Sequence, residues 1–279
     1  MKKLFIITIL SLLSTIALAQ KETLEKRNFQ VDSFTGIAVS GVVEVTLEKS
    51  ASHSVSLETY NEVFEYIEVK VRNGILHIGF KDGGVPRSIQ RKYKDLKVTS
   101  KVTLPVLESV ELSGVTKLFA RDRFDSHDLN IELSGVSQAE FEYIESAAMD
   151  VEVSGVSKIQ LYGETEQLDL EISGASKGFF VMENKSLTFA NIEISGSSEG
   201  TFEGKAIRSL LDISGTAVFE GMKFQVETMK AVISGVARAR VNVAGSLEPE
   251  VSGAAKLRYN GNVTLRNVNK SGAAHMTTY

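Results

Sequence analysis

The dipeptide Ser-Gly recurs along this chain at an almost constant interval, and no other feature of the sequence restricts the possible folds as strongly. Its nine regular copies begin at Ser113, Ser134, Ser154, Ser173, Ser195, Ser214, Ser234, Ser252 and Ser271. Successive copies lie 18 to 22 residues apart, and one isolated copy precedes them at Ser40. A short, steady period is typical of repeat proteins, in which like residues of successive repeats occupy like positions.

The residues on either side of each Ser-Gly alternate between apolar and polar. In the first repeat Val110 and Leu112 flank Glu111, and in the fifth Ile192 and Ile194 flank Glu193. Such alternation predicts a strand with one buried face. A second alternation follows the glycine, because Phe141, Leu161, Phe180, Phe202, Val241 and Tyr259 each lie six places beyond one.

These patterns predict an all-β fold, a parallel β-helix (solenoid) with coils of about 20 residues. Each coil would contain two or three short strands and a tight corner where glycine adopts a positive φ. Coils would stack about 4.8 Å apart, so that apolar columns form a continuous core. A β-propeller blade needs about forty residues, and antiparallel barrel strands need hairpin turns at shorter spacing. The solenoid is therefore favoured over both alternatives.

Residues 1–19 have the three parts of a secretory signal peptide. Lys2 and Lys3 precede an apolar run from Leu4 to Ala19, which ends in the small-x-small pattern Ala17-Leu18-Ala19. As a helix that run is about 24 Å long, less than the roughly 30 Å hydrocarbon core of a bilayer. We expect cleavage before Gln20 and export to the periplasm, the cell surface or the medium. An uncleaved membrane anchor is the alternative, and no later segment approaches transmembrane length.

The mature chain divides by regularity into residues 20–105 and residues 106–279. The first part contains strand-like runs, one helical turn at Asn61–Tyr66, and an Asn73-Gly74 pair that favours a type I′ hairpin turn. We interpret it as wider coils that cap the stack, since a bare terminal coil would expose unpaired strand edges. The second part forms the regular repeats of the same continuous domain. Its last copy, Ser271 to Tyr279, begins a coil and stops, which predicts an uncapped end.

The composition argues against several classes of function. The chain has no Cys, which excludes disulfides, cysteine zinc sites, thiol nucleophiles and a lipoprotein anchor. Its 31 basic and 35 acidic residues give a net charge of -4, without the basic excess of a nucleic-acid-binding protein. The four histidines are scattered, and no catalytic, phosphate-binding or calcium-binding motif occurs. We therefore predict no cofactor, no metal site and no catalytic residues.

Two charged surfaces are the candidate binding sites. The acidic one consists of Glu132, Asp150, Glu152, Asp169, Glu171 and Glu193, which the repeat would stack on one face. Neighbouring carboxylates would repel one another by roughly 0.9 kcal/mol in water, and a cation or a cationic partner would relieve this. The simpler interpretation is a solvated face that keeps the solenoid soluble.

The basic surface consists of Arg238, Arg240, Lys256 and Arg258. The two arginines lie three and five residues past Gly235, and the second pair occupies the same places after the next glycine. Stacked strands would gather the four cations within about 10 Å, which suits an anionic glycan or a lipid headgroup. Lys158 and Lys177 extend the row, although Glu199 and Val218 interrupt it. A solvated face that balances the acidic one is again the simpler interpretation.

Three stretches of the repeat resemble a known bacterial family: Val110–Gly114, Asp169–Gly174 and Asn191–Gly196, with their Leu-Ser-Gly or Glu-Ile-Ser-Gly endings. Together with the signal peptide and the leading β-rich segment, they are similar to the family described as “Putative auto-transporter adhesin, head GIN domain”, common in Bacteroidetes cell envelopes. The resemblance covers roughly residues 30–275. It implies a right-handed parallel β-helix and an adhesin-like role, and it supplies no catalytic residues.

The expected function is a non-enzymatic envelope scaffold that binds glycans or envelope and surface proteins. Two alternative functions remain. A polysaccharide-processing enzyme would use a shallow groove on the solenoid, but the repeat lengths leave no insertions to build the walls of a cleft. A structural envelope module would self-associate through its uncapped last coil.

Overall fold

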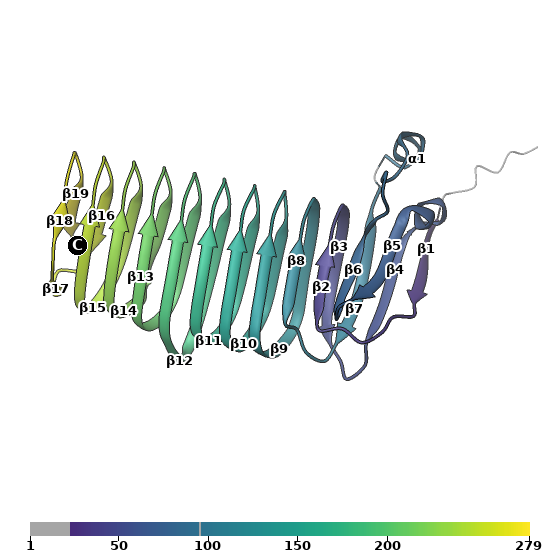
Figure 1. The fold of residues 1–279 in the computed structure, drawn as a ribbon, viewed down its shortest axis with the longest axis horizontal. Helices are drawn as coiled ribbons and strands as arrows, with labels where there is room; N and C mark the ends of the chain where they lie inside the picture. Colours follow the sequence, from purple (N-terminus) through teal and green to yellow (C-terminus); the bar gives the residue numbers. More distant parts are fainter. Residues whose placement is uncertain (1–22, 95) are drawn as a thin grey trace, which may run out of the picture.

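The computed structural model describes residues 23–94 and 96–279. The predicted signal peptide, residues 1–19, lies outside this part of the chain. The described residues wind into an elongated β-solenoid, with coils stacked side by side along its length (Figure 1). The prediction of an all-β solenoid with coils of about 20 residues is confirmed.

Most coils of the regular part are traced by one long, bent strand. These strands are β9 (Val115–Leu133), β10 (Gln138–Val153), β11 (Lys158–Ile172), β12 (Lys177–Ile194), β13 (Glu199–Ile213), β14 (Val218–Ile233) and β15 (Arg238–Val251). Shorter strands follow at the end of the stack: β16 (Lys256–Tyr259), β17 (Thr264–Leu265), β18 (Asn269–Lys270) and β19 (His275–Thr278). From β9 to β15 each strand pairs in parallel with the next.

The stacking keeps like positions of the repeat in register. Leu133 pairs with Val153, which pairs with Ile172, and the same column continues through the following coils. The side chains one and three places before each serine face inward and are buried from Val110 to Ile233, as the alternation predicts. Registered apolar columns therefore form one core that runs along the solenoid.

Large and small residues compensate each other within this core. Gly178 and Gly200 each lie two residues before an aromatic ring, Phe180 and Phe202, and these two rings stack 4.9 Å apart. One coil further the order is reversed, because Phe219 precedes Gly221 and its ring lies 5.4 Å from that of Phe202. A Cβ added at Gly221 would lie 2.4 Å from the Phe219 ring. At this place in the core each of these coils thus combines one aromatic ring with a glycine two residues away.

The residues up to the end of β8 form a cap of mixed pairing at one end of the stack. Its elements are β1 (Leu24–Phe29), β2 (Gly36–Val39), β3 (Val42–Lys49), β4 (Ser54–Tyr60), the 3₁₀ helix η1 (Asn61–Tyr66), β5 (Ile67–Arg72), β6 (Ile75–Phe80), helix α1 (Arg87–Lys92), β7 (Val98–Leu104) and β8 (Ser109–Leu112). Antiparallel pairs β5–β6, β4–β7 and β1–β4 cover this end, where continued parallel stacking would leave an edge. The predicted helical turn at Asn61–Tyr66 and the hairpin at Asn73-Gly74 are both confirmed.

The isolated Ser-Gly copy at Ser40 belongs to the same column of corners as the regular ones. Strand β2 pairs with β8 and β3 pairs with β9, all in parallel. Gly41 therefore lies against Gly114, whose added Cβ would be 2.7 Å from the Gly41 carbonyl oxygen. The irregular stretch between Gly41 and Gly114 leaves the stack of coils and returns to it, and this stretch forms most of the cap.

The Ser-Gly corners need glycine for two separate reasons. Gly155 has a φ of +74°, which L-residues with a side chain rarely adopt. A Cβ at this position would also lie 2.5 Å from the carbonyl oxygen of Gly135 in the preceding coil. That oxygen accepts a 2.8 Å hydrogen bond from the Val156 amide, so it cannot retreat without breaking the stack.

We expect Gly155→Ala to destabilise the protein by about 2–4 kcal/mol, because backbone strain and a backbone clash act together. Gly74→Ala is the matched control: its φ is +76°, but no atom lies within 4 Å of the added Cβ. The control should lose only about 1–2 kcal/mol from backbone strain. Urea unfolding followed by circular dichroism measures both, and equal losses would contradict the proposed clash.

Candidate functional site: charged faces of the solenoid

The four predicted basic residues lie on the outer face of two neighbouring coils. At the start of β15 the buried residues Ala239 and Val241 alternate with Arg238 and Arg240, and the buried Ala237 directly precedes the strand. In β16 the same alternation places Lys256 and Arg258 outside. Successive side chains of a strand point to opposite faces, and one face of each of these strands belongs to the core. The four cations therefore point outward.

Parallel register brings these cations together. Arg238 pairs with Lys256, and Arg240 with Arg258. Strand β19 continues both columns with His275 and Thr277, which the sequence analysis did not select although they occupy the same repeat positions. All six side chains line a hollow of about 440 Å³. We call this surface, Arg238, Arg240, Lys256, Arg258, His275 and Thr277, the basic hollow.

The basic hollow ends abruptly toward the cap. Arg240 Nη1 forms an ion pair with Glu220 Oε2 at 3.0 Å. Two coils further, Lys177 Nζ contacts Glu199 Oε2 at 2.8 Å, and this hydrogen bond raises the pKa of Lys177. Lys158 and Lys177 do share the column with Arg238, but Glu199 and Val218 lie between them, as the spacing predicts.

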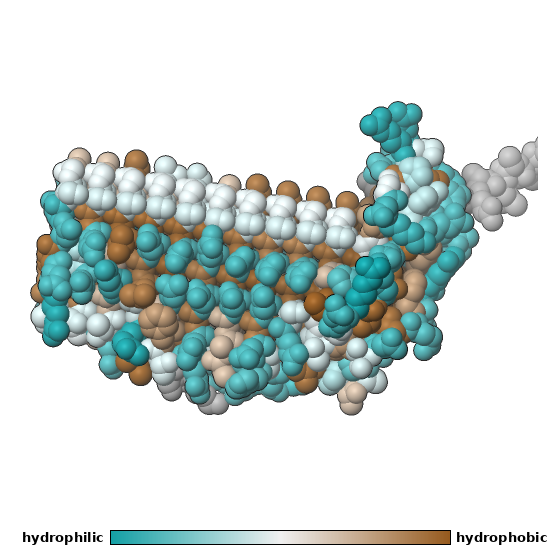
Figure 2. Space-filling view, in the orientation of Figure 1, coloured by the Kyte–Doolittle hydropathy of each residue, from teal (hydrophilic) through white to brown (hydrophobic). Residues whose placement is uncertain are grey.

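The predicted acidic residues form two columns on the opposite half of each coil. One column contains Glu132, Glu152, Glu171 and Glu193, paired in register from β9 to β12. The other contains Asp150 and Asp169, which Asn130 and Asn191 flank. Figure 2 shows this face, with hydrophilic side chains in rows over these coils. We call it the acidic face.

Stacking of like charges on the acidic face alters protonation. Partial burial raises the pKa of Asp150, and the charges of Asp169 and Glu132 raise it further. The pKa of Glu152 is raised by burial and then by Glu132, Asp150, Glu171 and Asp169. An amide relieves part of the repulsion, because Asn191 Nδ2 donates a 3.0 Å hydrogen bond to Asp169 Oδ1. At Asp150 and Glu152 the ionised carboxylate is therefore less favourable in the folded protein than in the unfolded chain.

The cap adds a groove to the acidic face that the sequence analysis did not find. Lys70 and Arg72 of β5 line a hollow of about 420 Å³ together with Glu111, Glu132 and Glu152. Strand β5 is separated from β10 by four strands of the sheet, so the β5–β6 hairpin must curl over the face. Asn73-Gly74 predicts the hairpin, but its curl depends on tertiary packing.

A second hollow on the acidic face is formed mainly by residues of β9 to β12. It has a volume of about 660 Å³, and its lining includes His127, Asp128, Asp150 and Asp169 above the buried side chains of Met149 and Leu168. Over residues 23–94 and 96–279, no three histidine or acidic side chains are arranged to hold a metal ion. No helix in this part of the chain is long and apolar enough to cross a membrane.

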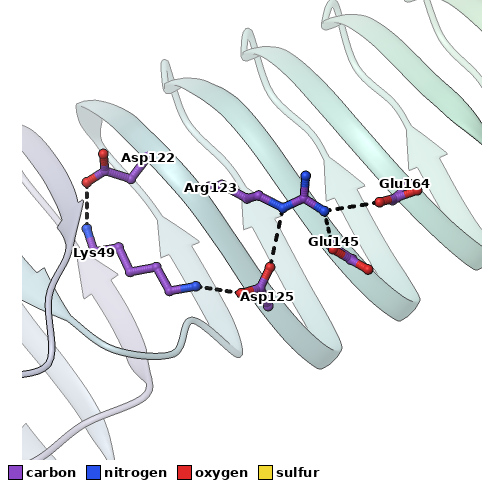
Figure 3. A network of polar contacts seen from close by, with 6 residues as sticks. All are labelled: Lys49, Asp122, Arg123, Asp125, Glu145 and Glu164. Atoms are coloured by element: carbon purple, nitrogen blue, oxygen red, sulfur yellow. Dashed lines mark hydrogen bonds and ion pairs between the residues drawn. The ribbon is translucent and has the colours of Figure 1, made fainter.

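An ion-pair network at the bends of the coils joins the cap to the solenoid (Figure 3). Lys49, at the end of β3, donates its amide to Asp122 at 2.7 Å and its ammonium to Asp125 at 2.5 Å. Arg123 contacts Asp125 and Glu145 and lies 3.2 Å from Glu164, whose side chain is 9% exposed. The Lys49 hydrogen bond lowers the pKa of Asp125. The network spans β3, β9, β10 and β11, and its role is structural.

We expect Glu152→Gln to stabilise the protein at neutral pH by a few tenths to about 1 kcal/mol, since it removes repulsion by neighbouring carboxylates. The pKa of Glu152 is higher in the folded state, so its unfavourable contribution is present above that pKa. It decreases as the pH falls through the folded pKa toward the unfolded one. The gain should shrink at acid pH and in high salt.

Urea unfolding at several pH values and salt concentrations measures this difference. Glu227→Gln is the matched control, because Glu227 is an exposed residue at the bend of β14 outside the acidic face. It removes the same charge and should give no comparable gain. A gain of equal size in both variants would show that net charge, and not the stacked face, is responsible.

We expect Arg123→Met to destabilise the protein more than Arg121→Met. Arg123 pairs with the buried Glu164 and lies over the Tyr143 ring at 4.3 Å. Arg121 has a 3.4 Å contact with the exposed Glu142 and lies 4.7 Å from the Phe119 ring. Both variants lose one cation and one ring contact, but Arg123 also contacts Asp125 and Glu145, so the difference reports on its carboxylate partners, of which Glu164 is the buried one. Thermal melting measures it, and equal midpoints would contradict the structural role.

The sequence matches the protein family described as “Putative auto-transporter adhesin, head GIN domain” over residues 33–178 and 175–263. No curated protein matches the chain significantly. Among solved structures, it is similar to a putative adhesin of Parabacteroides merdae, with 18% identity, a TM-score of 0.64, and coverage of 93% of this chain and 97% of the other. A putative adhesin of Parabacteroides distasonis has 19% identity and a TM-score of 0.63, with coverage of 92% of this chain and 98% of the other. A protein of that organism described as “Putative lipid binding protein” has 15% identity and a TM-score of 0.62, with coverage of 93% of this chain and 98% of the other. These likenesses support the same fold.

Proposed function

The chain belongs to the family described as “Putative auto-transporter adhesin, head GIN domain”, and from this premise we propose that it is a non-enzymatic, exported binding protein of the cell envelope. Its partners are anionic glycans or proteins of the envelope or cell surface, and it acts in the periplasm or on the cell surface. The solenoid is the scaffold that holds charged side chains at fixed intervals. The family membership supports an adhesin-like role for this scaffold.

The observation that carries the proposal is the basic hollow. Its four cations, Arg238, Arg240, Lys256 and Arg258, lie on strands whose backbones are held by neighbouring coils. Little backbone conformational entropy is therefore lost when a ligand binds. Arginine pairs well with carboxylate, sulfate and phosphate groups through two parallel hydrogen bonds. An anionic glycan offers such groups along a chain, and the hollow of about 440 Å³ gives them a concave surface to enter.

The proposal is tested with the chain from Gln20 to Tyr279 on a panel of immobilised acidic and neutral polysaccharides. We expect salt-sensitive retention on acidic polysaccharides only, without the appearance of cleaved ends. The variant with Arg238, Arg240, Lys256 and Arg258 changed to Ser should bind at least tenfold more weakly, a loss of about 1.4 kcal/mol or more.

The matched control changes Arg87, Arg91, Lys94 and Lys205 to Ser, which removes the same charge from exposed positions elsewhere. It should retain binding. Equal losses in both variants would show unspecific attraction to the whole protein. Cleaved ends would support the alternative of a polysaccharide-processing enzyme, and no retention on any polysaccharide would overturn the proposal for glycans.

A further inference from the structure

The lysine and arginine side chains of the basic hollow are confined to two neighbouring coils, and the third coil adds His275 and Thr277. Arg238, Lys256 and His275 follow one another in register, and Arg240, Arg258 and Thr277 form the second column. Strands lie about 4.8 Å apart and alternate residues about 6.8 Å apart along a strand, so the six residues of the basic hollow cover an area of about 10 by 7 Å. This is the size of one or two sugar residues, much shorter than the solenoid.

Carboxylates close the hollow on the side of the cap. Glu220 pairs with Arg240 at 3.0 Å, and Glu199 pairs with Lys177 at 2.8 Å. In the column of Arg238 the next residues toward the cap are Val218 and Glu199. A polyanion that continued along the solenoid would therefore meet an apolar side chain and then negative charge. A long ligand gains nothing from Lys177 and Lys158 beyond this barrier.

An aromatic side chain stands beside the cations. Tyr279 is 51% exposed, and its amide donates a 3.1 Å hydrogen bond to the carbonyl oxygen of Tyr259 in the preceding coil. Tyr279 follows His275 and Thr277 at the next alternate position of the last coil, so it continues the outward face of β19 at the rim of the hollow. Burial of part of the ring raises the pKa of Tyr279 and the charge of Glu220 raises it further, while the nearby charges of Arg240 and Arg258 lower it. An open aromatic ring next to cations offers an apolar platform and charged donors in one place.

We propose that the basic hollow binds a short anionic saccharide of one or two sugar residues, with the ring of Tyr279 as its platform. The carboxylate, sulfate or phosphate groups of the sugar pair with Arg238, Lys256 and Arg258, and the apolar face of the sugar ring lies on Tyr279. His275 and Thr277 supply further polar contacts at the open side. This inference rests on the proposed function, because it specifies the ligand of the same surface.

The saccharide chemistry follows from the combination of groups. Cations alone would suit any small anion, such as inorganic phosphate. The aromatic ring adds a surface that a small inorganic ion cannot use but a pyranose can. The barrier at Val218 and Glu199 limits the length of the ligand, which distinguishes recognition of a short unit or chain end from binding along a running polymer.

The first experiment is calorimetric titration of the chain from Gln20 to Tyr279 with uronate oligosaccharides of increasing length. We expect the affinity to stop rising after the second or third sugar residue. Tyr279→Ala should weaken binding about five- to tenfold, the size of one aromatic contact, whereas Tyr279→Phe should retain it. Tyr162→Ala is the matched control, because Tyr162 is 42% exposed and lies on β11, far from the hollow.

A second variant tests the barrier by removing it. Val218→Lys together with Glu199→Lys would join Lys177 to Arg238 in one unbroken basic column. In this variant the affinity should continue to rise with oligosaccharide length beyond the plateau of the unchanged protein. The gain does not depend on a loss of folding, so it remains informative if Tyr279→Ala is unstable.

Each result has a distinct meaning. Affinity that rises with length in the unchanged protein, or Tyr279→Ala binding as tightly as the unchanged protein, would overturn this inference and leave the proposed function intact. Inorganic phosphate that binds as tightly as a disaccharide would show a simple anion site and also overturn it. If the unchanged protein bound no acidic saccharide or polysaccharide, the proposed function itself would fail.

Discussion

Backbone hydrogen bonding between successive Ser-Gly corners is the interaction on which the rest of this structure depends. The amide after each glycine donates to the carbonyl of the glycine one coil earlier, as from Val136 to Gly114 and from Val156 to Gly135, at 2.7 and 2.8 Å. Each regular corner holds its glycine at positive φ, with no space for a Cβ against the preceding coil. Because every coil starts from such a corner, its strands enter the sheets in register with those of its neighbours.

Register turns one position of the repeat into a column along the molecule, and this has opposite consequences inside and outside. Inside, like apolar residues stack favourably, and departures such as Phe219 with Gly221 are compensated within the same coil. Outside, like charges stack, and burial together with the neighbouring carboxylates raises the pKa of Asp150 and of Glu152. At these two positions the regular charged surface is held at a cost in stability.

Two hollows of the described residues occur where the regular columns are interrupted. The β5–β6 hairpin curls over the acidic face at the cap, and the basic hollow lies beyond the carboxylates of Glu199 and Glu220. A third hollow, of about 660 Å³, lies between these places on the coils of β9 to β12. The hollows at the two ends differ from it because lysine and arginine side chains line them, which suits the short anionic ligand proposed for the basic hollow.

The sequence by itself determined the period, the buried and exposed faces and the composition of the charged columns, because each depends on local alternation and on glycine at fixed spacing. Residues such as Arg238 and Lys256 could be placed side by side from that spacing alone. Only the tertiary structure decided the position of Ser40-Gly41 in the column of corners, the curl of the β5–β6 hairpin, the Arg123 network and the proximity of Tyr279 to the basic hollow. These features join residues at different positions of the repeat or outside it. Their contacts therefore depend on how the chain packs and not on its period.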